Sequence, residues 1–270
     1  MITDTPVLVT RDGDIARVTL NRPDKHNALN VEVMTSLLRT ARTLRRDRDL
    51  RAVIVHGAGP SFCSGLDFPQ VTRRPGWALR AFVTRAARGT NVFQEVCWAW
   101  RRLPVPVIAA IHGSCFGGGL QLALAADFRL ATPDSRLSIL EAKWGLIPDM
   151  SGSVALRELL PIDQAKLLAM TGRTLSGDDA LALHLVTAVV DDPIAAADQL
   201  AAELATRSPD AVAATKELLQ SNQVADEAEA FRTERRLQAK VLLGPNQRIA
   251  LKANAKKQPP RFGRRLFGMW

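Results

Sequence analysis

The sequence predicts an α/β protein, because short apolar runs typical of strands alternate with longer segments of helical pattern. Runs at residues 7–9, 15–20 and 51–56 have the composition of strands, and each is separated from the next by a turn signal or a helical segment. Beyond residue 192 the pattern is helical only. We therefore expect an α/β part over residues 1–192 and a helical region over residues 193–270.

Local signals place the first elements. Asp12 and Gly13 stand between the first two apolar runs, and Asp-Gly at such a place predicts a β-hairpin. Asn30 precedes apolar residues at helical spacing, which predicts that a helix begins after it. Residues 69–100 are less regular, and we expect irregular structure followed by a helix there.

A glycine stretch gives the first indication of chemistry. The apolar run at residues 105–111 predicts a buried strand, and Gly117, Gly118 and Gly119 follow it before the helix-forming sequence LQLALAAD. A strand that passes through glycines into a helix leaves backbone N–H groups free at the helix start. Those groups suit an oxygen that carries negative charge. We expect an oxyanion site here.

Two carboxylates follow this helix. Glu141 and Asp149 are eight residues apart, and a pair of carboxylates in one site can remove a proton and return it. Each also has a plainer interpretation. Ser138 with Glu141 fits a helix capping box, and Asp149 precedes a helical segment that it could cap. From these residues alone both interpretations stay open.

The composition is ordinary for a globular protein, with 47% apolar and 23% charged residues. The sequence contains no apolar run of 18 residues and no secretory leader, so we expect neither a membrane span nor secretion. Three cysteines without zinc-like spacing favour reduced thiols and a cytoplasmic protein.

The net charge of +9 is concentrated at one end. Residues 235–270 hold ten Lys or Arg and no acidic residue, so the rest of the chain is nearly neutral. This distribution argues against a nucleic-acid-binding protein, which needs a basic folded face. A membrane contact by the basic end stays open, but a flexible end is the interpretation that we favour.

Several motifs resemble the crotonase family, also called the enoyl-CoA hydratase/isomerase superfamily. NRPDKHNAL resembles the first CoA-binding loop of the family, and SFCSGLDF its first oxyanion loop. HGSCFGGGLQLALAADFRLA resembles the second oxyanion loop, ILEAKWGLIPDMSGS the catalytic loop, and SPDAVAATKELL the C-terminal helical part. Their order and spacing identify the chain as a member of the family.

The resemblance implies a spiral of β-β-α turns followed by a C-terminal helical region that packs trimers or hexamers. It implies an acyl-CoA thioester as substrate and no separate cofactor, because coenzyme A is part of the substrate. Leu66 and Gly118 occupy the positions whose backbone N–H groups hold the thioester carbonyl as it becomes an enolate. Fixed donors of this kind contribute roughly 3 kcal/mol each to such a reaction.

The resemblance also implies the contacts to the substrate. Basic residues of the C-terminal helices are expected near the CoA phosphates, with Lys252, Lys256 and Lys257 as candidates, and Trp144 is expected to line the acyl pocket. The expected substrate and CoA contacts are Lys25, His26, Ala28, Cys63, Ser64, Leu66, Asp67, Phe68, Phe116, Gly117, Gly118 and Trp144.

One position departs from the family pattern. Family hydratases carry two glutamates; Glu141 matches the second, whereas Gln121 replaces the first. An amide can orient a water molecule, but it cannot take up a proton as a carboxylate does. The dienoyl-CoA isomerase branch carries a carboxylate at the position of Asp149, although it also has an acid where this chain has Gln121. We therefore favour double-bond isomerisation; hydration by Glu141 with Gln121, and acyl-CoA binding without catalysis, are the alternatives.

Overall fold

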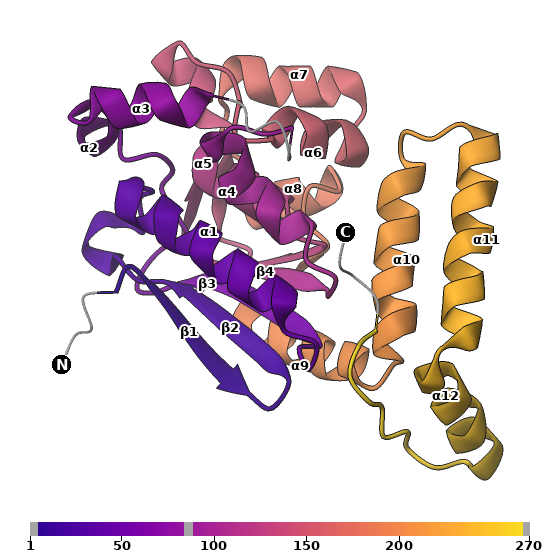
Figure 1. The fold of residues 1–270 in the computed structure, drawn as a ribbon. Helices are drawn as coiled ribbons and strands as arrows, with labels where there is room; N and C mark the ends of the chain where they lie inside the picture. The colour runs from indigo at the N-terminus through magenta and orange to yellow at the C-terminus, as the bar shows by residue number, and fades with distance from the viewer. Residues whose placement is uncertain (1–4, 84–88, 267–270) are drawn as a thin grey trace.

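The computed structural model describes residues 5–83 and 89–266, and it has the α/β architecture that the sequence predicts (Figure 1). The main sheet has six strands in the order β1-β2-β3-β4-β6-β8. The β1–β2 pair is antiparallel and forms the predicted hairpin, while all the other neighbours are parallel. The strands are β1 (Val7–Asp12), β2 (Ile15–Leu20), β3 (Ala52–Gly57), β4 (Val107–Ile111), β6 (Phe128–Ala131) and β8 (Ala188–Val189).

A second, two-stranded parallel sheet lies at the end of β4. It pairs β5 (Ser114–Phe116) with β7 (Arg136–Ser138), and each of these strands follows a strand of the main sheet along the chain. The chain therefore turns from the main sheet into the small one just before the glycine stretch. This arrangement brings the segment after β5 and the segment after β7 to the same edge of the molecule.

The main sheet is covered on both faces. Alternate residues of β3 point to opposite faces, as the period of a strand requires. Val53 and Val55 belong to the large core that includes α1 (Val31–Arg46), whereas Ile54 belongs to a smaller core that includes α9 (Pro193–Ala205). The helix α1 begins as predicted, because the Asn30 side chain accepts a hydrogen bond from the Val33 N–H.

Residues 69–100, which were predicted to be irregular before one helix, contain more helix than expected. Two short helices precede a longer one there. Other helices surround the small sheet. These elements are η1 (Pro23–Lys25), α2 (Phe68–Thr72), α3 (Pro75–Phe82), α4 (Val92–Arg101), α5 (Gly118–Leu124), η2 (Leu140–Trp144), α6 (Gly152–Leu159), α7 (Ile162–Thr171) and α8 (Gly177–Ala182).

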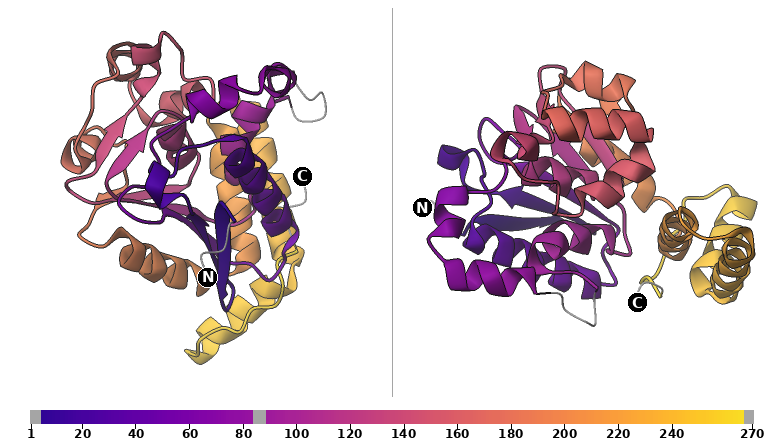
Figure 2. Two further views of the ribbon diagram at one scale, coloured as in Figure 1. Left: turned by 90° about the vertical axis from the view of Figure 1, so that its left-hand side faces the viewer. Right: turned by 90° about the horizontal axis from the view of Figure 1, so that it is seen from above.

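The last three helices stand beside the α/β body (Figures 1 and 2). They are α10 (Pro209–Asn222), α11 (Glu227–Leu243) and α12 (Pro245–Lys256). The boundary predicted at residue 192 stays a prediction. The helix α9 lies beyond it in sequence and packs on the sheet through Ala197 and Ala201.

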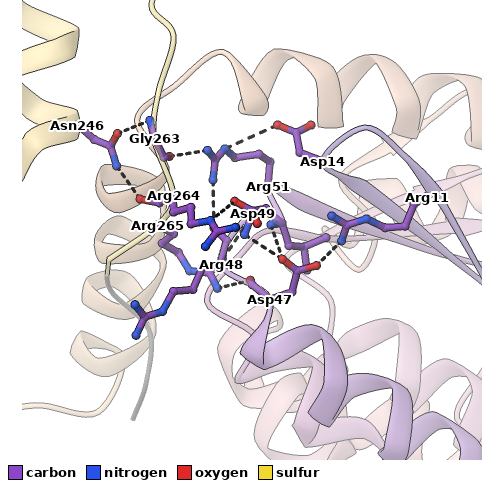
Figure 3. A network of polar contacts seen from close by, with 11 residues as sticks. Arg11, Asp14, Asp47, Arg48, Asp49, Arg51, Asn246, Gly263, Arg264 and Arg265 are labelled. Carbon is purple, nitrogen blue, oxygen red and sulfur yellow. Dashed lines mark hydrogen bonds and ion pairs between the residues drawn. The ribbon is translucent and has the colours of Figure 1, made fainter.

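Residues 263–266 are held by contacts with the rest of the protein, several of which Figure 3 shows, so the expectation of a flexible end was wrong for these residues. Arg265 is only 2% exposed, and its guanidinium donates to the carbonyls of Leu50 and Asp47. Arg264 forms an ion pair with Asp49. The sequence could not indicate these contacts, because the partners lie more than 200 residues away along the chain.

The membrane contact left open for the basic end stays a prediction. The charges of Arg264 and Arg265 face protein groups, and residues 267–270 lie outside the described residues. Across the part of the chain that the structure describes, no helix is both long enough and apolar enough to cross a bilayer.

Candidate active site

The two glycine-containing loops lie side by side at the small sheet. The backbones of Cys63 and Cys115 form an isolated parallel β-bridge, and the Phe116 N–H donates to the Cys63 carbonyl at 2.9 Å. Gly65 has a φ of +95°, and a Cβ built on it would lie 3.6 Å from the Gly118 nitrogen and 2.8 Å from the Phe116 oxygen. A glycine at position 65 therefore permits the close approach of the two loops.

The N–H groups of Leu66 and Gly118 are available for a ligand. Among residues 5–83 and 89–266, neither group donates a hydrogen bond to the protein. Gly118 is the first residue of α5, where backbone N–H groups have no partner within the helix. The structure thus brings the two predicted oxyanion donors to neighbouring loops.

Glu141 lies in η2 with a largely buried side chain, 8% exposed. Its Oε1 accepts a hydrogen bond from the Gln121 Nε2 at 2.5 Å, whereas its buried Oε2 has no partner within the described residues. Burial raises the pKa of Glu141 above the ordinary value of a carboxyl group, and the nearby charge of Asp149 acts in the same direction. Glu141 can therefore hold a proton more readily than an exposed glutamate.

Asp149 lies in the loop before α6, and burial raises its pKa as well. The capping interpretations of both carboxylates were wrong. The residue at the start of α6 is Ser151, no side chain caps that helix, and the hydroxyl of Ser138 donates to the Gly172 carbonyl instead. Neither carboxylate is explained as a helix cap, and Asp149 adjoins Met150, whose N–H donates to the same Gln121 side chain that contacts Glu141.

Gln121 connects Glu141 to the loop that carries Asp149. It lies in α5 and is fully buried. Its Oε1 accepts hydrogen bonds from the N–H groups of Met150 and Gly152, at 2.8 and 2.9 Å. The sequence identified Gln121 as the position of a missing acid; it gave no sign of these backbone contacts.

Comparison with known proteins identifies the family. A family profile described as Enoyl-CoA hydratase/isomerase matches residues 10–265. The chain belongs to this family. Its resemblance to the crotonase superfamily, predicted from the motifs, is confirmed, and so is the crotonase-type α/β fold with C-terminal helices.

Relatives within the family carry different names. An enoyl-CoA hydratase of Mycobacterium tuberculosis is 31% identical over 96% of both chains. The mitochondrial Δ(3,5)-Δ(2,4)-dienoyl-CoA isomerase of Homo sapiens is 35% identical over 75% of this chain and 64% of its own length. The crystal structure of a putative enoyl-CoA hydratase of Streptomyces coelicolor superposes with a TM-score of 0.86 at 33% identity, covering 96% of this chain and 94% of that one.

A half-buried ion pair that the sequence analysis missed holds the SFCSGLDF loop. Arg22 contacts Asp67 through both terminal nitrogens at 3.2 Å, and it also donates to the Ala28 carbonyl at 2.6 Å. Asp67 follows Leu66 directly, so the pair connects the NRPDKHNAL motif to the loop that carries one predicted oxyanion donor. Arg22 stands within NRPDKHNAL, and that motif was the available signal.

The expected CoA-loop residues come together around these contacts. His26 and Asn27 both have left-handed backbone conformations, with φ of 46° and 57°. The Ser64 N–H donates to the His26 carbonyl at 2.9 Å, and Lys25 at the end of η1 is exposed. The Asn27 side chain donates to the Ser61 carbonyl at 2.7 Å, which fixes the strained loop.

Aromatic residues lie at the outer edge of the site. The rings of Phe68 and Trp144 are 5.7 Å apart, and Trp144 is 64% exposed. Leu146 and Ile147 beside it are also exposed. The predicted role of Trp144 in an acyl pocket stays a prediction, to which this exposed apolar group adds candidates.

The cysteines of the loops are poor nucleophiles. Burial raises the pKa of Cys63 to about 12 and that of Cys115 well above its ordinary value. Groups of three or more His, Cys, Asp or Glu side chains placed to hold a metal ion do not occur among the described residues.

Proposed function

We propose that the protein isomerises double bonds of enoyl- or dienoyl-CoA thioesters, with Glu141 and Asp149 as the two proton carriers. The observation that carries this proposal is the pair of carboxylates with raised pKa values in a region where residue 121 is a neutral amide. A double-bond shift requires two groups that can take up and release a proton, and a raised pKa makes a carboxylate better suited to that role. The family relationship supports a thioester substrate.

The proposed mechanism uses the two backbone donors and the two carboxylates. The thioester carbonyl accepts hydrogen bonds from the N–H groups of Leu66 and Gly118. One carboxylate removes a proton from the carbon next to the carbonyl, and the negative charge moves to the carbonyl oxygen as an enolate. The other carboxylate delivers a proton at the far end of the conjugated system, which shifts the double bond without a change in mass. The two backbone donors stabilise the enolate by roughly 3 kcal/mol each.

The loops around the donors supply the CoA contacts in this proposal. Backbone groups near Lys25, His26 and Ala28 meet the pantetheine and ribose, and Phe68 and Trp144 border the acyl chain. The reaction uses no separate cofactor, because CoA arrives with the substrate. We include a trimer or hexamer in the proposal, with Lys252, Lys256 and Lys257 as candidate partners of the CoA phosphates.

Hydration is the second candidate function, and the hydratase relative that spans 96% of both chains favours it. In that reaction Glu141 and Gln121 would hold the attacking water. The contacts of Gln121 weigh against this role, because its oxygen already accepts two backbone hydrogen bonds. Acyl-CoA binding without turnover is the third outcome to be distinguished.

The test is an assay of the purified protein with 2-enoyl-, 3-enoyl- and 3,5-dienoyl-CoA esters, followed by ultraviolet absorbance and product mass. The proposal predicts a shift of the double bond with unchanged mass, abolished by Glu141→Gln and by Asp149→Asn. A gain of one water that depends on Glu141 alone would replace isomerisation by hydration. Binding without either change across the panel would favour the non-catalytic alternative.

A further inference from the structure

The orientation of the Gln121 amide is fixed by its neighbours. Two backbone N–H groups, those of Met150 and Gly152, point at one side-chain atom, and only the amide oxygen can accept from them. The amide NH2 therefore faces Glu141. A Cβ on Gly152 would lie 2.6 Å from the Gln121 Oε1, so the close contact also depends on a glycine at that position.

This orientation constrains the protonation of Glu141. Because Gln121 donates to Oε1 at 2.5 Å, Oε1 must accept and cannot hold a proton directed at the amide. The other oxygen, Oε2, is buried and has no hydrogen-bond partner within the described residues. A proton on Glu141 is therefore carried by Oε2.

We propose that Gln121 is a positioning residue: it fixes Glu141 so that Oε2 alone takes up and releases the proton, and it joins Glu141 to the loop that bears Asp149. This inference rests on the proposed function for its catalytic meaning. It assigns Gln121 a role different from that of a water-holding second acid. The amide acts through Glu141 and does not exchange protons itself.

The inference explains why a neutral side chain suits position 121. A glutamate there would still accept from the Met150 and Gly152 N–H groups, but its second oxygen would face Glu141 Oε1 at hydrogen-bond distance. Two carboxylates so placed cannot both be ionised without strong repulsion, so they share one proton. The pKa for loss of that shared proton is raised. The other titratable groups that interact with Glu141 are Asp149 in the adjoining loop and Cys97 in α4.

The test compares Gln121→Glu and Gln121→Met with the wild type, with Gln238→Glu on the exposed face of α11 as the matched control for added charge. In Gln121→Glu the acid limb of the kcat profile should move to higher pH by about one unit or more, because the base loses its proton only at higher pH. In Gln121→Met kcat should fall about tenfold or more while KM changes less than about twofold. Gln238→Glu should leave both unchanged.

A second readout does not depend on turnover. The carboxyl pKa of Glu141 can be followed by carbon NMR of glutamate-labelled protein, with the signal assigned by its loss in Glu141→Gln. The pKa should rise in both position-121 variants, and more in Gln121→Glu, since both lose the donor and one gains a charge. An unchanged Glu141 titration in Gln121→Glu would overturn the inference even if isomerase activity is found. If no substrate turns over but the titration shifts as stated, the proposed function fails and the positioning by Gln121 stands.

Discussion

At the scale of single residues, the site depends on burial more than on ion pairs. The main cause of the raised pKa of Glu141 is loss of solvent, and the same cause dominates for Asp149. A carboxylate that is costly to ionise is suited to proton transfer near neutral pH. The folded protein bears the free-energy cost of this arrangement, and that cost is measurable.

Glu141→Gln should stabilise the protein at neutral pH. The folded-state pKa of Glu141 is raised, so its contribution to stability is fully present below the ordinary carboxyl pKa of about 4.3 and is lost as the pH rises through the folded value. The isosteric amide removes that loss and can still accept from Gln121. Thermal unfolding of both proteins across this pH range should give the variant a higher Tm at neutral pH, and a gap that narrows in acid. A gap independent of pH would contradict this assignment.

Gly152→Ala should disturb the site directly. The added Cβ would lie 2.6 Å from the Gln121 Oε1 and displace the amide. We expect a loss of about 1–3 kcal/mol in urea unfolding together with reduced turnover. Gly76→Ala in α3 is the control, because a Cβ there meets nothing within 4 Å. Equal stability of the two variants would show that the Gln121 contact is looser than described.

At the scale of elements, the sequence predicted what local pattern controls. The hairpin at Asp12-Gly13, the helix after Asn30 and the strand leading to the glycines all follow from neighbouring residues. Contacts between elements could not be predicted in this way. The Arg22–Asp67 pair and the Gln121–Glu141 hydrogen bond join segments 45 and 20 residues apart, and no local pattern indicates them.

Arg22→Ala should loosen the first oxyanion loop. The variant loses the pair with Asp67 and the hydrogen bond to the Ala28 carbonyl, so the Leu66 N–H is no longer held in place. Misplacing such a donor should lower kcat about tenfold to a hundredfold. Arg74→Ala, which removes an exposed pair with Glu32, is the matched control. The same kcat in both variants, measured on folded protein, would show that Leu66 does not depend on Arg22.

At the scale of the whole molecule, residues 263–266 connect the C-terminal helices to the α/β body (Figure 3). The Gly263 N–H donates to Asn246 of α12, and the Leu266 N–H donates to Asp210 of α10. Arg265 reaches the segment after α1 from the same stretch of chain. This stretch therefore fastens α10 and α12 to the α/β body.

Arg265→Ala should destabilise the protein by about 2 kcal/mol, because the buried Leu50 carbonyl and the half-buried Asp47 carbonyl lose their charged donor. Urea unfolding measures the loss, and hydrogen exchange should show faster opening of residues 257–266. Arg261→Ala, at an exposed position just before this stretch, should leave both unchanged. Matching stabilities for the two variants would contradict the buried connection.

The most direct measurement of the central claim is the double-bond shift carried out in D2O, with deuterium located by mass spectrometry and NMR. We predict that the wild type places deuterium at the far end of the shifted diene, and that Glu141→Gln and Asp149→Asn each abolish the shift. One of the two variants should still exchange the proton next to the thioester carbonyl, which would identify the other carboxylate as the group that delivers the final proton. A full double-bond shift in either variant would contradict the assignment of Glu141 and Asp149 as the proton-carrying pair.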